Sequence, residues 1–230
     1  MKKILAVLTL LILTLSKLFA DIPYQIIKTD LKGIKKIRYK EGGHTIIITD
    51  NNRLKILNIA DKKILKSSNV TNSTFAYNEK SNLLLYVYRI RSRQYKDYLK
   101  LQKLHNNSNI LNMLLSRDIN DWTSLAISNN GNLLAFSMGN IIYVWDINSN
   151  KKLYKLIGHY GNIERLEFSK DNNYFLSADR KGIVKLWNLH NGDWIHDFKI
   201  FTRASSIIKS VDSLCLVLIA RHLHLRVREI

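Results

Sequence analysis

The stretch YFLSADRKGIVKLWNL, residues 174–189, decides the fold. It contains two short apolar runs, 174–177 and 184–189, separated by a polar turn that includes Gly182. Runs of this kind on either side of a glycine-containing turn predict two antiparallel strands. The second run reads apolar, basic, apolar, variable, polar, apolar, and this pattern recurs along the chain.

Copies of the pattern begin at Leu54, Leu99, Ile142, Val184 and Leu225. Their fourth positions lie 41 to 45 residues apart and are Leu57, Gln102, Trp145, Trp187 and Arg228. A period of this length is typical of the four-stranded blades of a β-propeller.

Further apolar runs supply the other strands of each repeat. Residues 124–128 and 164–169 suit a first strand, 133–137 a second, and 152–156 and 193–198 a fourth. A blade is covered on both faces by its neighbours, which explains why several strands are apolar runs rather than alternations. Residues 106–120 are the least regular, and we expect a long connection there, with a short helical turn at 110–115. The sequence thus predicts an all-β chain of four-stranded antiparallel blades.

Residues 144–146 (Val-Trp-Asp), 186–188 (Leu-Trp-Asn) and 158–159 (Gly-His) resemble the signature positions of WD repeats. The chain is therefore identified as similar to the WD40-repeat β-propellers, in particular to an exported bacterial type. Asp146 is the acidic residue of the best-matching copy.

The resemblance also implies a buried network that links a His, a Ser or Thr, an Asp and a Trp. Carried over by position, it assigns structural roles to His159, Ser177 and Trp187. Lys181 stands where the Asp is expected, and Asp179 lies two residues too early, so we expect the network to be incomplete.

Five copies predict five blades in one WD40-like propeller domain over residues 21–230. The last copy ends at Ile230, which leaves its blade without a fourth strand. In the family that this chain resembles, the ring closes when an N-terminal segment supplies the missing outer strand of the last blade. Residues 22–28 suit that role. The alternative is a truncated member of a larger ring, because seven blades are the commoner design in that family.

Residues 1–20 have the form of a signal peptide. Lys2 and Lys3 precede an apolar run over 4–15, and Ala20 offers a cleavage site. We expect cleavage near Ala20 and a periplasmic or otherwise exported mature protein; an uncleaved anchor is the alternative. Cys215 is the single cysteine, so no disulfide or redox pair can form within the chain.

The formal net charge is +18, and loss of residues 1–20 leaves the chain strongly basic. Such a charge favours an acidic protein partner or peripheral contact with an anionic membrane. Nucleic acid is not an expected partner of an exported protein. The alternative is a purely compositional origin, since the chain is rich in Lys, Ile and Asn.

No set of residues assembles into an active site by spacing. His222 and His224 could share one strand face, but the sequence offers no third metal ligand. We therefore expect no enzymatic activity, no metal and no cofactor.

Residues 86–98 are the strongest candidate for partner binding. Arg89, Arg91 and Arg93 alternate, which places their charges on one side of an extended chain, and Tyr95 and Lys96 follow at the turn. Arginine and tyrosine are favoured at protein interfaces. The alternative is a solvated hairpin tip. Trp145 and Trp187, by contrast, are expected in the core.

Together these observations predict an exported, monomeric, non-enzymatic scaffold that binds another protein. A binder of anionic polymer or membrane is the first alternative. An accessory protein of a periplasmic redox enzyme, such as nitrate reductase, is the second, and it rests on the family resemblance alone.

Overall fold

The computed structural model describes residues 33–34, 36–39, 45–50, 52–58, 63–70, 74–91, 95–104, 106–116 and 124–199. The chain divides into two compact units, Met1–Asp30 and Leu31–Ile230, and every described residue belongs to the second. Several predictions fall outside the described residues: the signal peptide 1–20, the closing strand 22–28, Arg93, Cys215, His222, His224 and the fifth repeat with Arg228.

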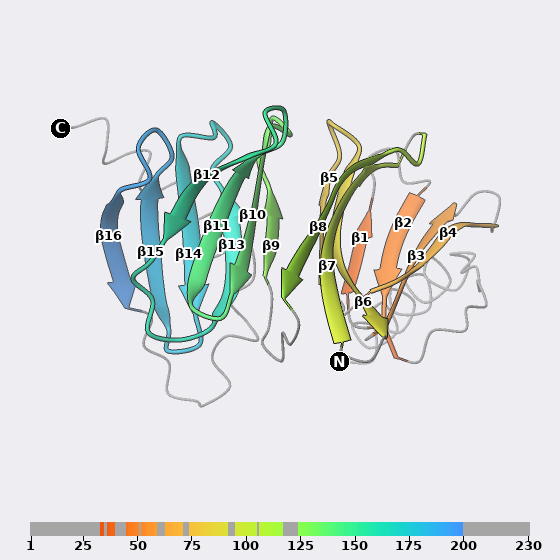
Figure 1. Ribbon diagram of the computed structural model, residues 1–230, viewed down its shortest axis with the longest axis horizontal. Coiled ribbons are helices and arrows are strands. Elements are labelled where there is room, and N and C mark those ends of the chain that lie inside the picture. Colours follow the sequence, from red (N-terminus) through yellow and green to blue (C-terminus); the bar gives the residue numbers. More distant parts are fainter. Residues whose placement is uncertain are drawn as a thin grey trace, which may run out of the picture. The chain divides into compact units, whose positions relative to one another are not determined.

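The described residues form four antiparallel sheets of four strands each, which can be followed by label in Figure 1. Sheet A consists of β1 (Lys36–Tyr39), β2 (Thr45–Thr49), β3 (Arg53–Asn58) and β4 (Lys63–Asn69). Sheet B consists of β5 (Phe75–Asn78), β6 (Leu83–Arg91), β7 (Tyr95–Lys103) and β8 (Asn109–Ser116). Sheet C consists of β9 (Leu125–Ile127), β10 (Leu133–Met138), β11 (Ile141–Asp146) and β12 (Lys151–Leu156). Sheet D consists of β13 (Ile163–Phe168), β14 (Tyr174–Asp179), β15 (Ile183–Asn188) and β16 (Trp194–Lys199).

Each of the first four copies of the sequence pattern lies on the third strand of its sheet. In every sheet the register between the third and fourth strands shifts at the same point of the pattern, directly before its fourth position. These irregularities precede Leu57, Gln102, Trp145 and Trp187. The four positions are therefore equivalent in backbone geometry even where the side chain is not Trp.

Consecutive sheets pack through shared apolar clusters. Ile47 and Ile56 of sheet A join Phe75 of sheet B, and Leu85 of sheet B joins Leu134 of sheet C. A third cluster joins sheets C and D, and a fourth contains residues of sheet D only. The arrangement is consistent with a β-propeller, while the count of five blades and the closure of the ring stay predictions.

Polar contacts join the turns between first and second strands of neighbouring sheets. The Asn78 side-chain amide donates to the carbonyls of Ser128 (2.6 Å) and Asn129 (3.1 Å). The Asn129 amide in turn donates to the carbonyl of Lys170 at 2.9 Å. Sheets B, C and D are thus linked at this end by side-chain hydrogen bonds as well as by their cores.

The prediction for residues 106–120 was wrong, because residues 109–116 form strand β8. Leu111, Met113 and Leu115 pack against the cluster shared with sheet C, while Ile110 and Leu114 are exposed. This two-residue alternation fits a strand that is covered on one face, and it excludes the helical turn.

Candidate functional site

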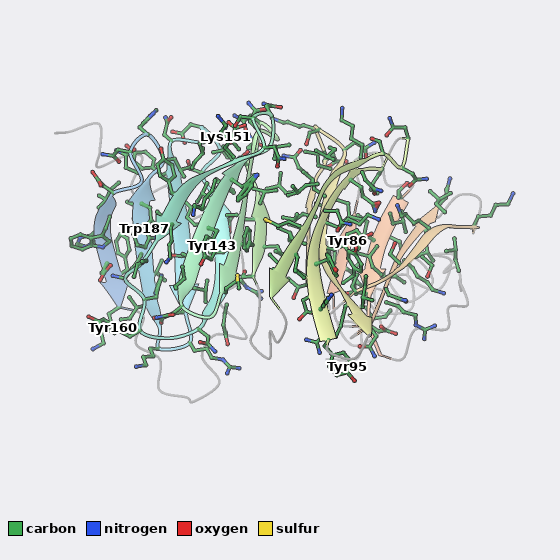
Figure 2. The ribbon with its side chains drawn as sticks, in the orientation of Figure 1. Tyr86, Tyr95, Tyr143, Lys151, Tyr160 and Trp187 are labelled. Carbon is green, nitrogen blue, oxygen red and sulfur yellow. The ribbon has the colours of Figure 1, made fainter. Side chains whose placement is uncertain are left out.

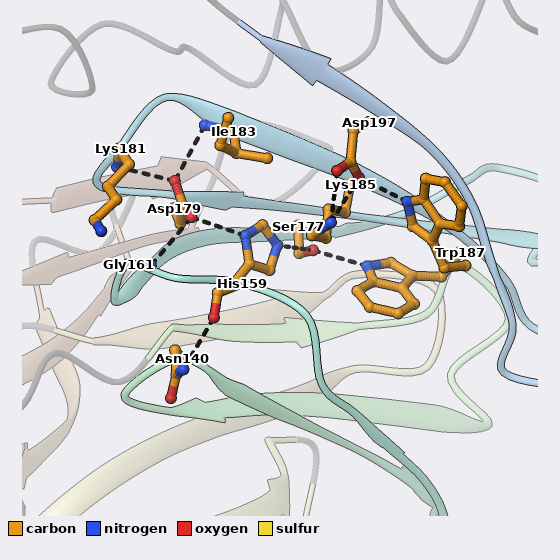
Figure 3. Close-up of polar contacts among 11 residues, drawn as sticks. Asn140, His159, Gly161, Ser177, Asp179, Lys181, Ile183, Lys185, Trp187 and Asp197 are labelled. Atoms are coloured by element: carbon orange, nitrogen blue, oxygen red, sulfur yellow. Dashed lines mark hydrogen bonds and ion pairs between the residues drawn. The ribbon is translucent and has the colours of Figure 1, made fainter.

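The best-defined polar cluster lies in sheet D, where a chain of hydrogen bonds runs from Asp179 to Trp187 (Figure 3). His159, in the loop after β12, reaches Asp179 through Nδ1 (3.0 Å) and the Ser177 hydroxyl through Nε2 (2.7 Å). The Trp187 indole N–H donates to the same hydroxyl at 2.8 Å. The structure therefore brings together His159, Ser177 and Trp187, the three residues that the sequence singled out.

Asp179 completes this network, so the expectation that it lies too early was wrong. Asp179 is the last residue of β14, and one carboxylate oxygen accepts the backbone N–H groups of Lys181 and Ile183 in the following turn. The other oxygen faces His159 and accepts from the Gly161 N–H at 3.3 Å. Lys181 contributes only its backbone, because a turn capped from its first residue turns the later side chains outward.

Burial lowers the pKa of His159, although the hydrogen bond and charge of Asp179 act against that effect. A neutral imidazole has one N–H donor and one acceptor. With the Nδ1–H donated to Asp179, Nε2 accepts the Ser177 O–H, and the Ser177 oxygen accepts from Trp187. This assignment follows from the neighbours of each atom, and it satisfies every polar side-chain atom from the carboxylate to the indole.

The order Asp, His, Ser matches the arrangement of a hydrolase triad. A nucleophile must reach its substrate, yet His159 is 3 % exposed and Ser177 and Asp179 are 0 % exposed. The Ser177 oxygen is also held by the Trp187 donor. The network therefore joins the loop after β12 to β14 and β15, and its geometry is that of a structural element.

The equivalent positions in the other sheets carry different side chains. Gln102 donates to the Tyr86 hydroxyl at 3.3 Å, in the place of the Trp187 to Ser177 contact. Trp145 is only partly buried, and its N–H donates to Asn150 in the following turn at 3.1 Å. Trp145 packs against the core cluster that sheets B and C share, so the expectation that it belongs to the core is confirmed in part. Its N–H does not repeat the Trp187 contact, because Phe136 occupies the position of the serine and offers no acceptor.

Two further repeat positions have local roles. Leu57 is fully buried in sheet A, as an apolar residue at the fourth position should be. The Asp146 carboxylate accepts the backbone N–H of Ser149 at 2.8 Å and so caps the turn after β11.

The basic hairpin joins β6 to β7. Arg89 forms a two-pronged ion pair with Asp97, with N to O distances of 2.7 and 2.8 Å, and Asp97 is 2 % exposed. Arg91 pairs through its backbone with Tyr95, whose ring lies 5.2 Å from the Arg89 guanidinium. The charge of Arg89 is thus neutralised within sheet B, while Tyr95 is exposed and Lys96 is partly exposed.

A second exposed surface lies on the loop that carries His159, and the sequence analysis missed it. Ile157 is 61 % exposed and Tyr160 is 84 % exposed, and Tyr160 projects beyond the strand ends in Figure 2. Two contacts hold the loop in place. The His159 side chain is buried, and the Asn140 amide donates to the His159 carbonyl at 2.9 Å. Two large exposed side chains, Ile157 and Tyr160, are therefore displayed on a backbone that these contacts hold in place.

In the described ranges, no group of three His, Cys, Asp or Glu residues is placed to hold a metal ion. Nor does any described residue lie in a helix with the length and hydrophobicity to span a bilayer.

Comparison with known protein families gives a match on sheets C and D. Residues 150–188 match the family model described as WD domain, G-beta repeat. This stretch contains β12 to β15 and all four residues of the buried network.

Three curated relatives match longer stretches. Autophagy-related protein 16 of Arabidopsis thaliana is 27% identical over 46% of this chain and 19% of its own length. Pre-mRNA-processing factor 19 homolog 2 of the same plant is 30% identical over 37% of the chain and 16% of its own length. WD repeat-containing protein 18 of Rattus norvegicus is 24% identical over 44% of the chain and 23% of its own length. The matched stretches thus span less than a quarter of each of these relatives, and they support the WD-repeat assignment of this part of the chain.

Proposed function

We propose that this protein is a non-enzymatic scaffold that binds another protein through the ends of its sheets. The resemblance to WD-repeat proteins supports this function class, and the structure of sheet D supports it from the chemistry. Its Ser, His and Asp side chains are buried and committed to one another, whereas Ile157 and Tyr160 on the same loop face solvent.

The surface of Ile157 and Tyr160 carries the proposal. Tyrosine offers a rigid amphipathic area that loses little conformational entropy on binding, and such residues dominate the energetics of many protein interfaces. Here the backbone is fixed as well, because His159 between them is anchored by Ser177 and Asp179. A partner therefore meets a preorganised surface.

The test is recovery of partner proteins by tagged mature protein from a native envelope extract, at low and high salt. We expect a stoichiometric protein that survives high salt with the unmodified chain and is lost with I157S/Y160S. The matched control is L65S/L153S, which removes two other exposed apolar side chains from β4 and β12. Equal recovery by all three proteins would contradict the proposal.

A second candidate function is the binding of an anionic polymer or membrane surface. The exposed Lys151, Lys152 and Lys155 on β12 favour it, since none of them forms an ion pair within the described part of the chain. Such binding is screened by salt, with a Debye length of about 10 Å at 0.1 M. Recovery of anionic material alone, lost at high salt and lost in K151Q/K152Q, would support this function in place of the scaffold.

The proposal places the scaffold in an exported compartment, on the evidence of residues 1–20. N-terminal sequencing of the protein from its native source tests this, and an N-terminus at or near Asp21 is the expected result. An accessory role to a periplasmic redox enzyme is a narrower hypothesis, and co-recovery of such an enzyme in the same experiment is its test.

A further inference from the structure

The second position of the repeat is a lysine in both sheet B and sheet D, but a different residue lies opposite it on the fourth strand. Lys185 stands at the second position of the repeat on β15, opposite Asp197 on β16. Its Nζ lies 2.7 Å from each carboxylate oxygen of Asp197. The Trp194 N–H also donates to the Asp197 carboxylate at 2.6 Å. The negative charge of Asp197 therefore neutralises Lys185 within sheet D.

Lys100 stands at the same repeat position on β7 of sheet B, but Asn112 on β8 replaces the aspartate opposite it. The Lys100 ammonium lies 5.9 Å from the centroid of the Tyr88 ring. No described carboxylate pairs with it. Sheet B therefore keeps the lysine and lacks the carboxylate that neutralises it in sheet D.

A second lysine enters the same region from the neighbouring sheet. Lys66 of β4 donates to the Gln102 side-chain oxygen at 2.8 Å and to the Asn107 oxygen at 2.9 Å. Both acceptors are neutral. Partial burial and the charge of Lys100 together lower the pKa of Lys66, in agreement with two neighbouring ammonium groups.

Asn112 adds a neutral donor to these two cations. Its side-chain oxygen accepts from the Tyr88 hydroxyl at 3.1 Å, and its amide N–H groups have no partner in the described chain. Asn112 and Lys100 are cross-strand neighbours, so their side chains lie on the same face of sheet B. That face is turned toward Lys66, because Gln102 lies two residues from Lys100 on the same strand and contacts Lys66.

We propose that Lys66, Lys100 and Asn112 form a binding site for an oxyanion, either a phosphate or a carboxylate group. Partly buried cations are stabilised by an anion that accepts charge-assisted hydrogen bonds from them. The ligand supplies in sheet B the negative charge that Asp197 supplies in sheet D. The site is separate from the Ile157 and Tyr160 surface and does not depend on the scaffold function.

The test measures the thermal unfolding of the full chain with inorganic phosphate, and separately with acetate, each against chloride at equal ionic strength. We expect phosphate or acetate to raise the unfolding temperature, since an anion that binds only the folded state stabilises it. The anion with the larger effect identifies the group that the site prefers. Isothermal titration of the same anions gives the dissociation constants.

Three variants make the result specific. N112D builds the carboxylate of sheet D into sheet B, so it should unfold at a higher temperature in chloride and lose the response to both anions. K66Q/K100Q should lose the response and weaken binding about tenfold or more, because the variant removes both charged donors of the site. K170Q/K181Q removes the same charge from two exposed lysines of sheet D and should respond like the unmodified chain.

Equal responses of the unmodified chain, N112D and K170Q/K181Q would overturn the proposal, because general salt effects act on all three alike. N112D keeps the test decisive even where loss of the Lys66 hydrogen bonds unfolds the double variant, since it removes no lysine. A phosphate response retained in N112D would equally refute the site.

Discussion

The Ser177 hydroxyl contacts both His159 and Trp187, so it connects the two halves of the buried network. Ser177→Ala removes this hydroxyl with the smallest change of side-chain shape. Two groups then lose their partner: the Trp187 N–H donor and the His159 Nε2 acceptor. Trp187 and His159 are each 3 % exposed, so water cannot replace the serine. An unsatisfied buried polar group costs about 1–3 kcal/mol, so the two groups together predict a loss of about 2–6 kcal/mol of unfolding free energy.

The assay is urea denaturation followed by tryptophan fluorescence, because Trp187 reports directly on the site. Ser137→Ala in sheet C is the matched control. Ser137 is also fully buried, but its hydroxyl accepts only one contact, from the Ser124 backbone N–H at 2.8 Å. We expect the control to lose clearly less stability, about 1–3 kcal/mol.

A loss below about 0.5 kcal/mol for Ser177→Ala, with an unchanged denaturant slope, would refute the reasoning, since surface substitutions typically fall within that range. Equal losses in the two variants would also refute it. That outcome would mean that the shared network adds nothing beyond a single buried hydrogen bond.

Three further perturbations follow from the same structure. Burial lowers the pKa of His159 below 6.5, so the unfolded chain is protonated at this residue before the folded chain as pH falls. The stabilising contribution of neutral His159 is therefore complete above pH 6.5 and declines below it. H159Q should flatten the measured dependence of unfolding free energy between about pH 7.5 and 5. Gly131→Ala places a Cβ 2.6 Å from Ser81 at a φ of +75°, so thermal unfolding should show a loss of about 1–3 kcal/mol, part of which S81G restores in the double variant. Replacement of Arg89 by Met leaves the buried Asp97 carboxylate without this ion pair and should lower the free energy of unfolding by about 1.5–3 kcal/mol. Asp97→Asn in the same chain should recover part of that loss. Purely additive effects of the two substitutions would show that the pair is not coupled.

The repeat period predicted the four described sheets because it reflects a backbone constraint. Each of the four copies in the described residues contains the same irregularity in register, so Leu57 and Gln102 could be placed with Trp187 despite their different chemistry. Strand β8 was missed because the asparagines at positions 106, 107, 109 and 112 resemble turn residues. A count of every second residue from Leu111 would have found it.

The network could be predicted only in part. His159, Ser177 and Trp187 lie at motif positions, whereas the participation of Asp179 depends on a turn whose cap is the first residue and not the third. Asp50 in sheet A shows the same signal, since its carboxylate accepts the N–H groups of Asn52 and Arg53. The proximity of Lys66, Lys100 and Asn112 could not be predicted, because the sequence does not tell which residue of β8 lies opposite Lys100.

The asparagine contacts between sheets have a consequence for how the repeats behave as an array. A repeat that touched its neighbour only through apolar side chains could slide or open on its own, since such contacts have no preferred direction. The Asn78 and Asn129 amides instead bind backbone carbonyls of the next turn, which fixes each repeat in position and orientation. Nearest-neighbour coupling of this kind makes the repeats melt together rather than one by one, so that a fragment cut between them forfeits stability on both sides of the cut.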